Sequence, residues 1–497
     1  MSQEMSPEMK KESPRMKILF LAAEAVPFAK VGGLADVAGA LPKTLRSLGH
    51  DVRLMIPRYG TIRSDQFHFE KIGTPYPIPV GPGEELIHLV GTTLEGGEEL
   101  PVYLIWNDLY FSSRDQVYGF EDDAQRFTVF GRAALAALPM LGWQPDVIHA
   151  NDWHTGIVPA WLNTDGQCDP FYRSIATLFT IHNLAYQGVT GRLILTFARM
   201  DYLNHLPVEQ PGTVNWMAQG IAHADLINTV SPTYAQEILQ PDMGMGLAPL
   251  LQERQDRLSG VLNGLDYDRW NPATDPHIPH PFSVNTLDRR SANKIALQQQ
   301  ARLPVHSDVP LIGMVTRLDH IKGVDLLPAL ADWLFQREVQ LIVLGSGEPR
   351  YHRMLEELQA SYPGRMRVFL KFDDPLARRI YAGADIFLMP SVVEPCGLGQ
   401  MIAMRYGCVP VVRAVGGLAD TVSDNAALRG RGTGFVFSEF SPEACQEALE
   451  RALDTYTQEP DAWRGLQLRG MRADFSWTAS AQEYIQLYRQ AIERHNS

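Results

Sequence analysis

Residues 390–406 read PSVVEPCGLGQMIAMRY, and the pattern around this stretch decides the fold of the chain. The apolar run 384–389 before it predicts a short buried strand, and residues 398–406 carry the apolar spacing of a helix. Glu394 therefore lies in a strand-to-helix turn. In open parallel sheets such turns, at the carboxyl ends of the strands, are where ligands bind.

The same turn has the groups needed to hold a polyhydroxyl ligand that carries phosphate. Gly397 and Gly399 let a ligand approach the backbone closely. The start of the following helix offers free N–H groups and the positive end of its dipole to anionic or hydroxylated ligands. An ordinary turn with a solvated glutamate is the alternative for such a loop taken alone.

Strand and helix patterns alternate on both sides of a weakly patterned region at about 243–271. This alternation predicts an α/β protein with two doubly wound domains facing a cleft. Strands are expected at 17–23, 51–57, 102–106, 146–150, 178–183, 224–230, 310–315, 340–345, 367–370, 385–389 and 409–412. The segment 61–97, rich in Gly and Pro, is expected to be an insertion with short strands or a hairpin.

The composition is that of a globular protein without a nucleic-acid or membrane partner. The chain has 497 residues, 45% hydrophobic and 20% charged, and a formal net charge of −13. No apolar run approaches the length of a membrane span. Four cysteines without metal-ligand spacing indicate reduced thiols, and glutamates in the first 15 residues count against a targeting peptide. We expect a cytoplasmic protein with a disordered tail at 1–15.

The sequence VGGLAD occurs twice, at 31–36 and at 415–420, each time where a strand pattern gives way to a helix pattern. This echo indicates that the two halves share a plan. Gly32 and Gly33 of the first copy form a reasonable phosphate cradle, although Gly-Gly turns are common. The stretch lacks the patterns of a dinucleotide-binding fingerprint and of a P-loop.

Charged and polar residues follow several predicted strands. Arg317 and Lys322 flank one turn, and a guanidinium with an ammonium suits the two phosphates of a diphosphate. Asp152 and His182 follow two neighbouring strands of the first half, where hydrogen bonding to a sugar is a better interpretation than a metal site. The aromatic stretch 107–123 suits either sugar stacking or packing on the core.

Together these pieces resemble the bacterial glycogen synthase and plant starch synthase family, over about residues 17–477. The resemblance rests on the stretches KVGGLADV at 30–37, HANDWH at 149–154, FTIHNLAYQG at 179–188, VLNGLD at 261–266 and EPCGL at 394–398, together with Arg317 and Lys322. It implies the GT-B fold, with domains at 16–258 and 259–476 and a last helix, 477–497, that crosses back to the first domain. It also implies transfer of glucose from ADP-glucose to the non-reducing 4-OH of an α-1,4-glucan, with retained configuration, no metal and no other cofactor.

The family resemblance and the residue types suggest roles for individual side chains. Arg317 and Lys322 would stabilise the departing diphosphate, Glu394 would hold the glucosyl hydroxyls, and His182 would lie beside the sugar. The expected donor-binding residues are Lys30, Gly32, Gly33, Asp36, Asn263, Cys396, Gly397, Leu398 and Gly399. Glu24 and Asp152 are candidates for the acceptor side.

Two departures from the family pattern bear on donor affinity. Gly399 stands where the family often has Thr, and Asn151 stands where many members have His. Three alternatives stay open: a related transferase that uses UDP-glucose or a small acceptor, a sugar-nucleotide epimerase, and a non-catalytic glucan-binding protein. The polyglucan product itself is an expected partner, in the cytoplasm or in a plastid stroma.

Overall fold

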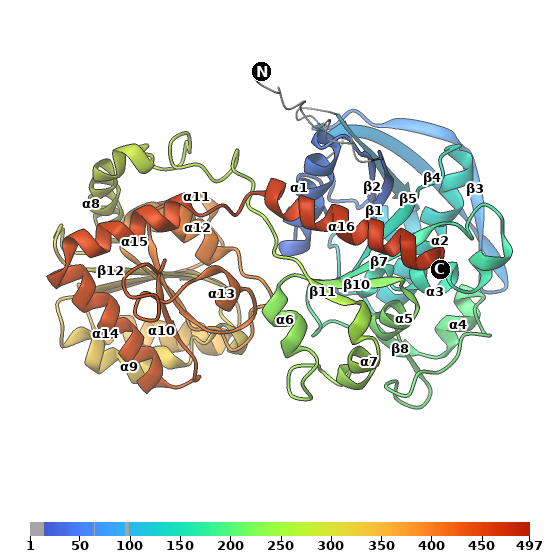
Figure 1. Cartoon of the computed structure of the whole chain (residues 1–497). Helices are drawn as coiled ribbons and strands as arrows, with labels where there is room; N and C mark the ends of the chain where they lie inside the picture. The colour runs from blue at the N-terminus through green and yellow to red at the C-terminus, as the bar shows by residue number, and fades with distance from the viewer. Residues whose placement is uncertain (1–13, 64, 95–98) are drawn as a thin grey trace, which may run out of the picture. The chain divides into compact units, whose positions relative to one another are not determined.

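The computed structural model describes residues 14–63, 65–94 and 99–497, and its contacts divide the chain into two compact units (Figure 1). The first unit comprises Met1–Ile227 and Tyr484–Ser497, and the second comprises Asn228–Glu483. The tail expected at 1–15 lies, up to residue 13, outside the described residues.

The first unit is built on a mixed sheet with the strand order β11-β10-β7-β6-β1-β2-β5-β4-β3, of which β11 and the last two residues of β10 fall in the second unit by the division above. Its central strands pair in parallel, as their apolar runs predict, and the side chains of β1 from Ile18 to Leu21 are fully buried. The insertion forms the expected antiparallel hairpin, β3 with β4. The strands are β1 (Lys17–Leu21), β2 (Asp51–Pro57), β3 (Glu70–Val80), β4 (Gly83–Leu94), β5 (Leu100–Trp106), β6 (Val147–Asn151), β7 (Ala176–Ile181), β10 (Leu226–Thr229) and β11 (Leu258–Gly260), with the small pair β8 (Val189–Gly191) and β9 (Thr213–Asn215).

Helices connect these strands, and the last helix of the chain returns to them. They are α1 (Gly33–Ser47), α2 (Asp123–Met140), α3 (Ile157–Leu162), α4 (Leu193–Ala198), α5 (Trp216–His223) and the C-terminal α16 (Trp477–His495). The hydroxyl of Tyr488 in α16 lies 2.8 Å from Nδ1 of His149 in β6, and both side chains are fully buried. At the end of α16, His495 pairs with Asp225 at 3.2 Å.

The second unit is built on a six-stranded parallel sheet in the order β14-β13-β12-β15-β16-β17. Its strands are β12 (Leu311–Val315), β13 (Gln340–Gly345), β14 (Met366–Leu370), β15 (Ile386–Met389), β16 (Val409–Arg413) and β17 (Phe435–Phe437). Its helices are α6 (Pro232–Glu237), α7 (Ala248–Glu253), α8 (Arg290–Ala301), α9 (Leu326–Phe335), α10 (Pro349–Ser361), α11 (Asp374–Gly383), α12 (Gly399–Arg405), α13 (Gly416–Thr421), α14 (Pro442–Gln458) and α15 (Pro460–Arg472).

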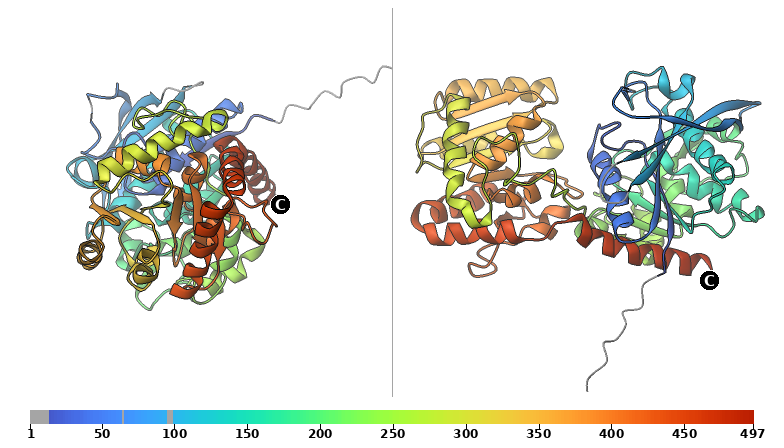
Figure 2. Two further views of the ribbon diagram at one scale, coloured as in Figure 1. Left: turned by 90° about the vertical axis from the view of Figure 1, so that its left-hand side faces the viewer. Right: turned by 90° about the horizontal axis from the view of Figure 1, so that it is seen from above.

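Alternate residues of these strands bury on opposite faces of the sheet. Ile312 and Met314 of β12 join one hydrophobic cluster with α9, α10 and α14, whereas Leu311 joins a second cluster with α8, α11 and α12. Figure 2 shows helices on both sides of this sheet. Because apolar side chains point both ways from every strand, the strands read as continuous apolar runs in the sequence. The predicted doubly wound α/β class is thus confirmed for the fold.

The division between the units by their contacts falls at Ile227, within β10. The reason is that α6 is bonded to α13. Thr233 Oγ1 donates a hydrogen bond to Asp420 at 2.6 Å, and the N–H of Gly416 donates to Glu237 at 3.0 Å. In the described part of the chain, every helix is too short or too polar to cross a membrane.

Candidate active site

Glu24 organises the Gly-Gly turn of the first unit. It follows β1, and its carboxylate accepts the N–H groups of Val31 and Gly32, the latter at 3.0 Å, where α1 begins. A carboxylate at a helix start binds there as an anion would. Glu24 was expected on the acceptor side, and the N–H of Gly32 was expected to meet a phosphate. In this structure these two groups are bonded to each other.

Lys30 and Asp36, both expected at the donor, form an ion pair across the same turn. Nζ of Lys30 lies 2.7 Å from the Asp36 carboxylate, and both side chains are partly exposed. A Cβ built at Gly33 would meet nothing within 4 Å, so the turn is open on that side. The first Gly-Gly turn therefore keeps a free approach for a ligand beside Lys30.

Asp152 is a buried acid whose charge changes near neutral pH. Its pKa is raised to about 7, mainly by burial and also by the nearby Glu24 carboxylate, although the backbone N–H bonds of His182 and Asn183 lower it. The His182 N–H bond is 2.7 Å long. Burial also raises the pKa of Glu24. Two neighbouring acids with raised pKa values are typical of a functional site.

Asn151 fixes the tautomer and the orientation of the His182 imidazole. The Asn151 amide donates to the carbonyl of Leu21 at 2.9 Å, which leaves its oxygen to accept from His182 Nε2 at 2.8 Å. Nε2 therefore carries the proton and Nδ1 is the acceptor. Burial lowers the pKa of His182 to about 3. Asn151, a departure from the family pattern, thus fixes the orientation of a predicted catalytic residue.

Tyr118 also belongs to this group, although the sequence analysis did not single it out from the aromatic stretch 107–123. Its hydroxyl interacts with Glu24, and burial together with that carboxylate holds its pKa well above the ordinary value. Its ring stacks on His154 with centroids 4.8 Å apart. Tyr118 differs from the other aromatic residues of the segment in lying beside Glu24 in the folded protein, which the sequence pattern does not show.

Glu394 and Lys322 meet in the second unit. Lys322 Nζ lies 2.6 Å from Glu394 Oε2, and the two side chains are 15% and 9% exposed. Ser391 donates its hydroxyl to the same oxygen at 3.1 Å. The N–H of Val392 bonds to the carbonyl of Ile321 at 2.8 Å, which joins the segment carrying Lys322 to residues 390–399, from here on the Glu394 loop.

Arg317 is not brought to the same point. Its side chain is 57% exposed and its guanidinium lies 3.4 Å from Asp319. The expected convergence of Arg317 with Lys322 is therefore not seen among the described contacts, because the two side chains leave the turn toward different carboxylates. An exposed, long side chain of this kind remains able to reach a ligand at the edge of the sheet.

The residues of the Glu394 loop that are expected to bind the donor are fixed by the loop backbone. Gly397 has a φ of +73°, and the buried Gln400 side chain donates to its carbonyl at 2.9 Å. Leu398 precedes α12, which begins at Gly399. A Cβ at Gly399 would lie 3.1 Å from the ring of Phe387, so the threonine common in the family would need a small shift of that ring.

Cys396 and Asn263 lie together below this loop. Cys396 is buried, and burial raises the pKa of its thiol to about 12, although the backbone N–H of Asn263 bonds to the sulfur. The thiol therefore stays protonated. Oδ1 of Asn263 is buried without a partner among the described residues, so it is available as an acceptor.

One further residue of the second unit was missed by the sequence analysis. Phe372 follows β14, at the carboxyl edge of the parallel sheet, and its ring is 84% exposed. It is the most exposed large aromatic side chain among the described residues. A single aromatic residue between charged neighbours gives no periodic signal, so only its exposure distinguishes it.

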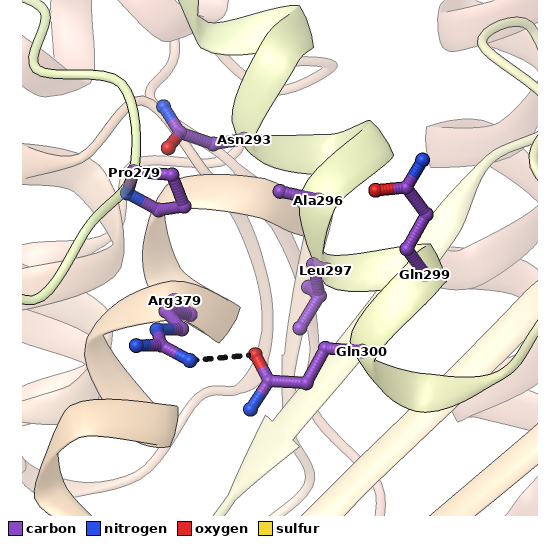
Figure 3. A pocket seen from close by; sticks show the side chains of 7 residues that line it. All are labelled: Pro279, Asn293, Ala296, Leu297, Gln299, Gln300 and Arg379. Atoms are coloured by element: carbon purple, nitrogen blue, oxygen red, sulfur yellow. Dashed lines mark hydrogen bonds between the residues drawn. The ribbon is translucent and has the colours of Figure 1, made fainter.

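Other candidate sites in the described residues carry less chemistry. Among the described residues there is no group of three or more His, Cys, Asp or Glu arranged to hold a metal ion. A hollow between α8 and α11 is lined by Pro279, Asn293, Ala296, Leu297, Gln299, Gln300 and Arg379 (Figure 3). The Arg379 guanidinium in it is already bonded to Gln300 and to the carbonyl of His277. Of the four cysteines, Cys168 is exposed and the other three are buried.

Comparison with known proteins matches both units. Residues 17–253 match the starch synthase catalytic domain family, and residues 297–464 match the glycosyl transferases group 1 family. The glycogen synthase of Moorella thermoacetica is 46% identical over 97% of this chain and 98% of its own length. That of Syntrophotalea carbinolica is 47% identical over 97% of this chain and 100% of its own length.

Solved structures give the same result for the fold. The catalytic domain of starch synthase IV from Arabidopsis thaliana, bound to ADP and acarbose, matches with a TM-score of 0.89 and 35% identity over 97% of this chain and 100% of that chain. A sucrose-phosphate synthase from Thermosynechococcus elongatus shares the fold at a TM-score of 0.59 and 20% identity, over 96% of this chain and 99% of that one.

Two Rossmann-like units, each with polar residues at the carboxyl ends of its strands, define a glycosyltransferase of the GT-B class. The glycogen synthases matched over nearly their whole length, at 46% and 47% identity, identify the family within this class. The chain belongs to the glycogen synthase and starch synthase family, whose members transfer glucosyl units in glycogen and starch synthesis.

Proposed function

We propose that the enzyme transfers glucose from ADP-glucose to the non-reducing 4-OH of an α-1,4-glucan, with retention of configuration and without a metal ion. The observation that carries this proposal is the ion pair of the largely buried Lys322 with the buried Glu394 at the carboxyl edge of the second sheet. The starch synthase relative bound to ADP and acarbose supports the adenine nucleotide and a glucan-like acceptor.

Departure of the nucleotide is the step that needs positive charge. As the bond between C1 of glucose and the diphosphate breaks, negative charge builds on the phosphate oxygens and positive charge on the sugar ring. Lys322 is placed to stabilise the first, with the exposed Arg317 joining it on donor binding. Glu394 stabilises the positive sugar and holds its hydroxyls. Fixed cations then take the role that a metal has in other transferases.

The acceptor attacks from the side that the diphosphate leaves. Its O4 forms a bond to C1, and its proton passes to the departing phosphate oxygen, so configuration is retained without a covalent enzyme intermediate. A neutral His182 donates no positive charge to the sugar, and its free Nδ1 and backbone carbonyl accept hydroxyl protons. Asp152 and Glu24 of the first unit hold acceptor hydroxyls.

Phe372 and Asn263 are proposed to determine which sugar nucleotide binds as the donor. An exposed aromatic ring suits stacking on a nucleotide base, and the unpartnered Asn263 oxygen suits a hydroxyl donor of the sugar nucleotide. We place the enzyme in the cytoplasm, because three of its four thiols are buried without disulfides. A UDP-glucose enzyme with the same mechanism is the second candidate.

The test is nucleotide release by purified protein with glycogen and either ADP-glucose or UDP-glucose, in buffer with excess EDTA. Release of ADP that depends on glycogen is the expected result. Release of UDP alone would change the donor, and release that stops with EDTA and returns with a divalent cation would refute the metal-free mechanism. Donor consumption without acceptor would indicate an epimerase or a hydrolase.

A further inference from the structure

The second copy of the repeated sequence VGGLAD packs directly on the Glu394 loop. The N–H of Gly417, in the first turn of α13, lies 3.2 Å from the carbonyl oxygens of both Glu394 and Pro395. A Cβ built at Gly416, which has a φ of +41°, would lie 2.0 Å from the Glu394 carbonyl oxygen, and one at Gly417 would lie 2.1 Å from that of Cys396. Backbone thus meets backbone, and only glycine fits.

This packing gives the two copies different functions. A Cβ at Gly33 of the first copy would meet nothing within 4 Å, so that turn has space for a ligand. The second turn has no such space, because the loop already fills it. Its glycines hold the loop that carries Glu394 rather than a phosphate.

Glu237 of α6 holds the second turn from the other side. Its Oε1 accepts the N–H of Gly416 at 3.0 Å. Thr233, one turn earlier, donates its backbone N–H and its hydroxyl to Asp420 of α13 at 3.0 and 2.6 Å. Ser231 caps α6 by accepting the N–H of Tyr234 at 2.9 Å, which fixes the helix that presents both side chains.

Arg413 forms a second connection from Glu237 to the loop. Its guanidinium donates to the carbonyl of Val392 at 2.9 Å and to that of Ser438 at 3.0 Å. Burial raises the pKa of Glu237, while the Gly416 N–H and the charge of Arg413 lower it. Oε2 of Glu237 is buried without a hydrogen-bond partner among the described residues, so the carboxylate is held there by Gly416 and by attraction to Arg413.

We propose that Glu237 is a positioning residue for glucosyl transfer: through the first turn of α13 it fixes the backbone of the Glu394 loop, and so the place of the Glu394 carboxylate. The proposal rests on the role of Glu394 given under the proposed function. Small displacements of a catalytic group lower turnover strongly, so the effect is on chemistry more than on substrate binding.

The experiment compares Glu237→Ala with Glu237→Gln, whose side-chain oxygen still accepts the Gly416 N–H. Gln236→Ala, an exposed side chain of the same helix, is the matched control. We expect Glu237→Ala to lower kcat about ten-fold with a smaller change in KM for the glucan, and Glu237→Gln to recover most of kcat. A Glu237→Ala enzyme with wild-type kcat, or a Glu237→Gln enzyme as slow as Glu237→Ala, overturns the proposal.

Two measurements keep the test decisive if Glu237→Ala folds poorly or the proposed reaction is wrong. Thr233→Val removes the hydroxyl bond from α6 to Asp420 of α13 and keeps the backbone N–H bond, with little change in shape, and it should also lower kcat. Hydrogen exchange of residues 390–399 needs no substrate, and it should be faster in Glu237→Ala than in wild type. Absence of activity in the wild type refutes the proposed function alone, whereas unchanged loop exchange in both variants refutes the role of Glu237.

Discussion

Replacing Lys322 by methionine separates the proposed catalytic role of its charge from its role in the folded protein. The ammonium lies 2.6 Å from Glu394 with both side chains largely buried, so their attraction is about 6 kcal/mol at an effective dielectric constant of ~20, before desolvation. Lys322→Met leaves the Glu394 carboxylate with Ser391 as its remaining hydrogen-bond donor. Loss of one partner from such a pair should lower the free energy of unfolding by about 3 kcal/mol, because both side chains keep some exposure.

For a unit of this size, that loss corresponds to a fall in Tm of about 6–12 °C, measured by calorimetry. The double variant Lys322→Met with Glu394→Gln should recover about 2 kcal/mol of this, since the uncompensated charge is gone, yet remain inactive in nucleotide release. Arg317→Met is the matched control: it should melt within about 1 °C of wild type, as an exposed substitution does, and still lose turnover. A Lys322→Met protein that melts as wild type, or a double variant less stable than the single one, would refute the reasoning.

Three further outcomes follow from the geometry. Burial raises the pKa of Asp152 to about 7, so between about pH 4 and pH 7 the folded protein holds a proton that the unfolded chain has lost. The free energy of unfolding should therefore fall as pH rises through this range. Asp152→Asn should flatten that slope in urea titrations. The bond to Asp225 raises the pKa of His495 above its ordinary value, so its stabilisation should be full below about pH 6.5 and vanish as pH rises through the raised value. The protection factor for hydrogen exchange at the end of α16, which corrects for the intrinsic rise of exchange with pH, should then fall at high pH in wild type and be low at all pH values in a His495→Gln variant. Gly397→Ala should lower stability by about 1–2 kcal/mol and kcat further, because a Cβ at φ +73° would lie 2.6 Å from a carboxamide oxygen; Gly430→Ala, at φ +80° in open space, is the control.

The strands and the fold class were predictable because buried parallel strands leave uninterrupted apolar runs. The meeting of Lys322 with Glu394 was predictable for a related reason: both follow strands of one parallel sheet, and strand ends share an edge. The order of strands and motifs along the chain thus predicts which residues gather at one edge of the sheet. It does not convey which of their atoms touch.

The individual contacts within the site depend on side-chain directions that no spacing encodes. Arg317 turns to Asp319, two residues away, and Glu24 turns back to the N–H groups of Val31 and Gly32. Both are local choices between several acceptors within reach of a flexible side chain. The role of the second VGGLAD copy was not predictable for another reason. It depends on packing against the Glu394 loop and on contacts with α6, which is distant in the sequence.

The uneven burial of the cysteines has a practical consequence for spectroscopy. Burial raises the pKa of Cys396, Cys408 and Cys445 to about 12, so these thiols stay protonated and shielded from alkylating reagents. Cys168 alone among the four is exposed, at the end of the short helical turn Asp165–Cys168 of the first unit. A maleimide dye or spin label would therefore attach at one known point of the natural sequence. With a second thiol introduced at an exposed position of the second unit, the distance between labels would report how the units move as donor and glucan bind.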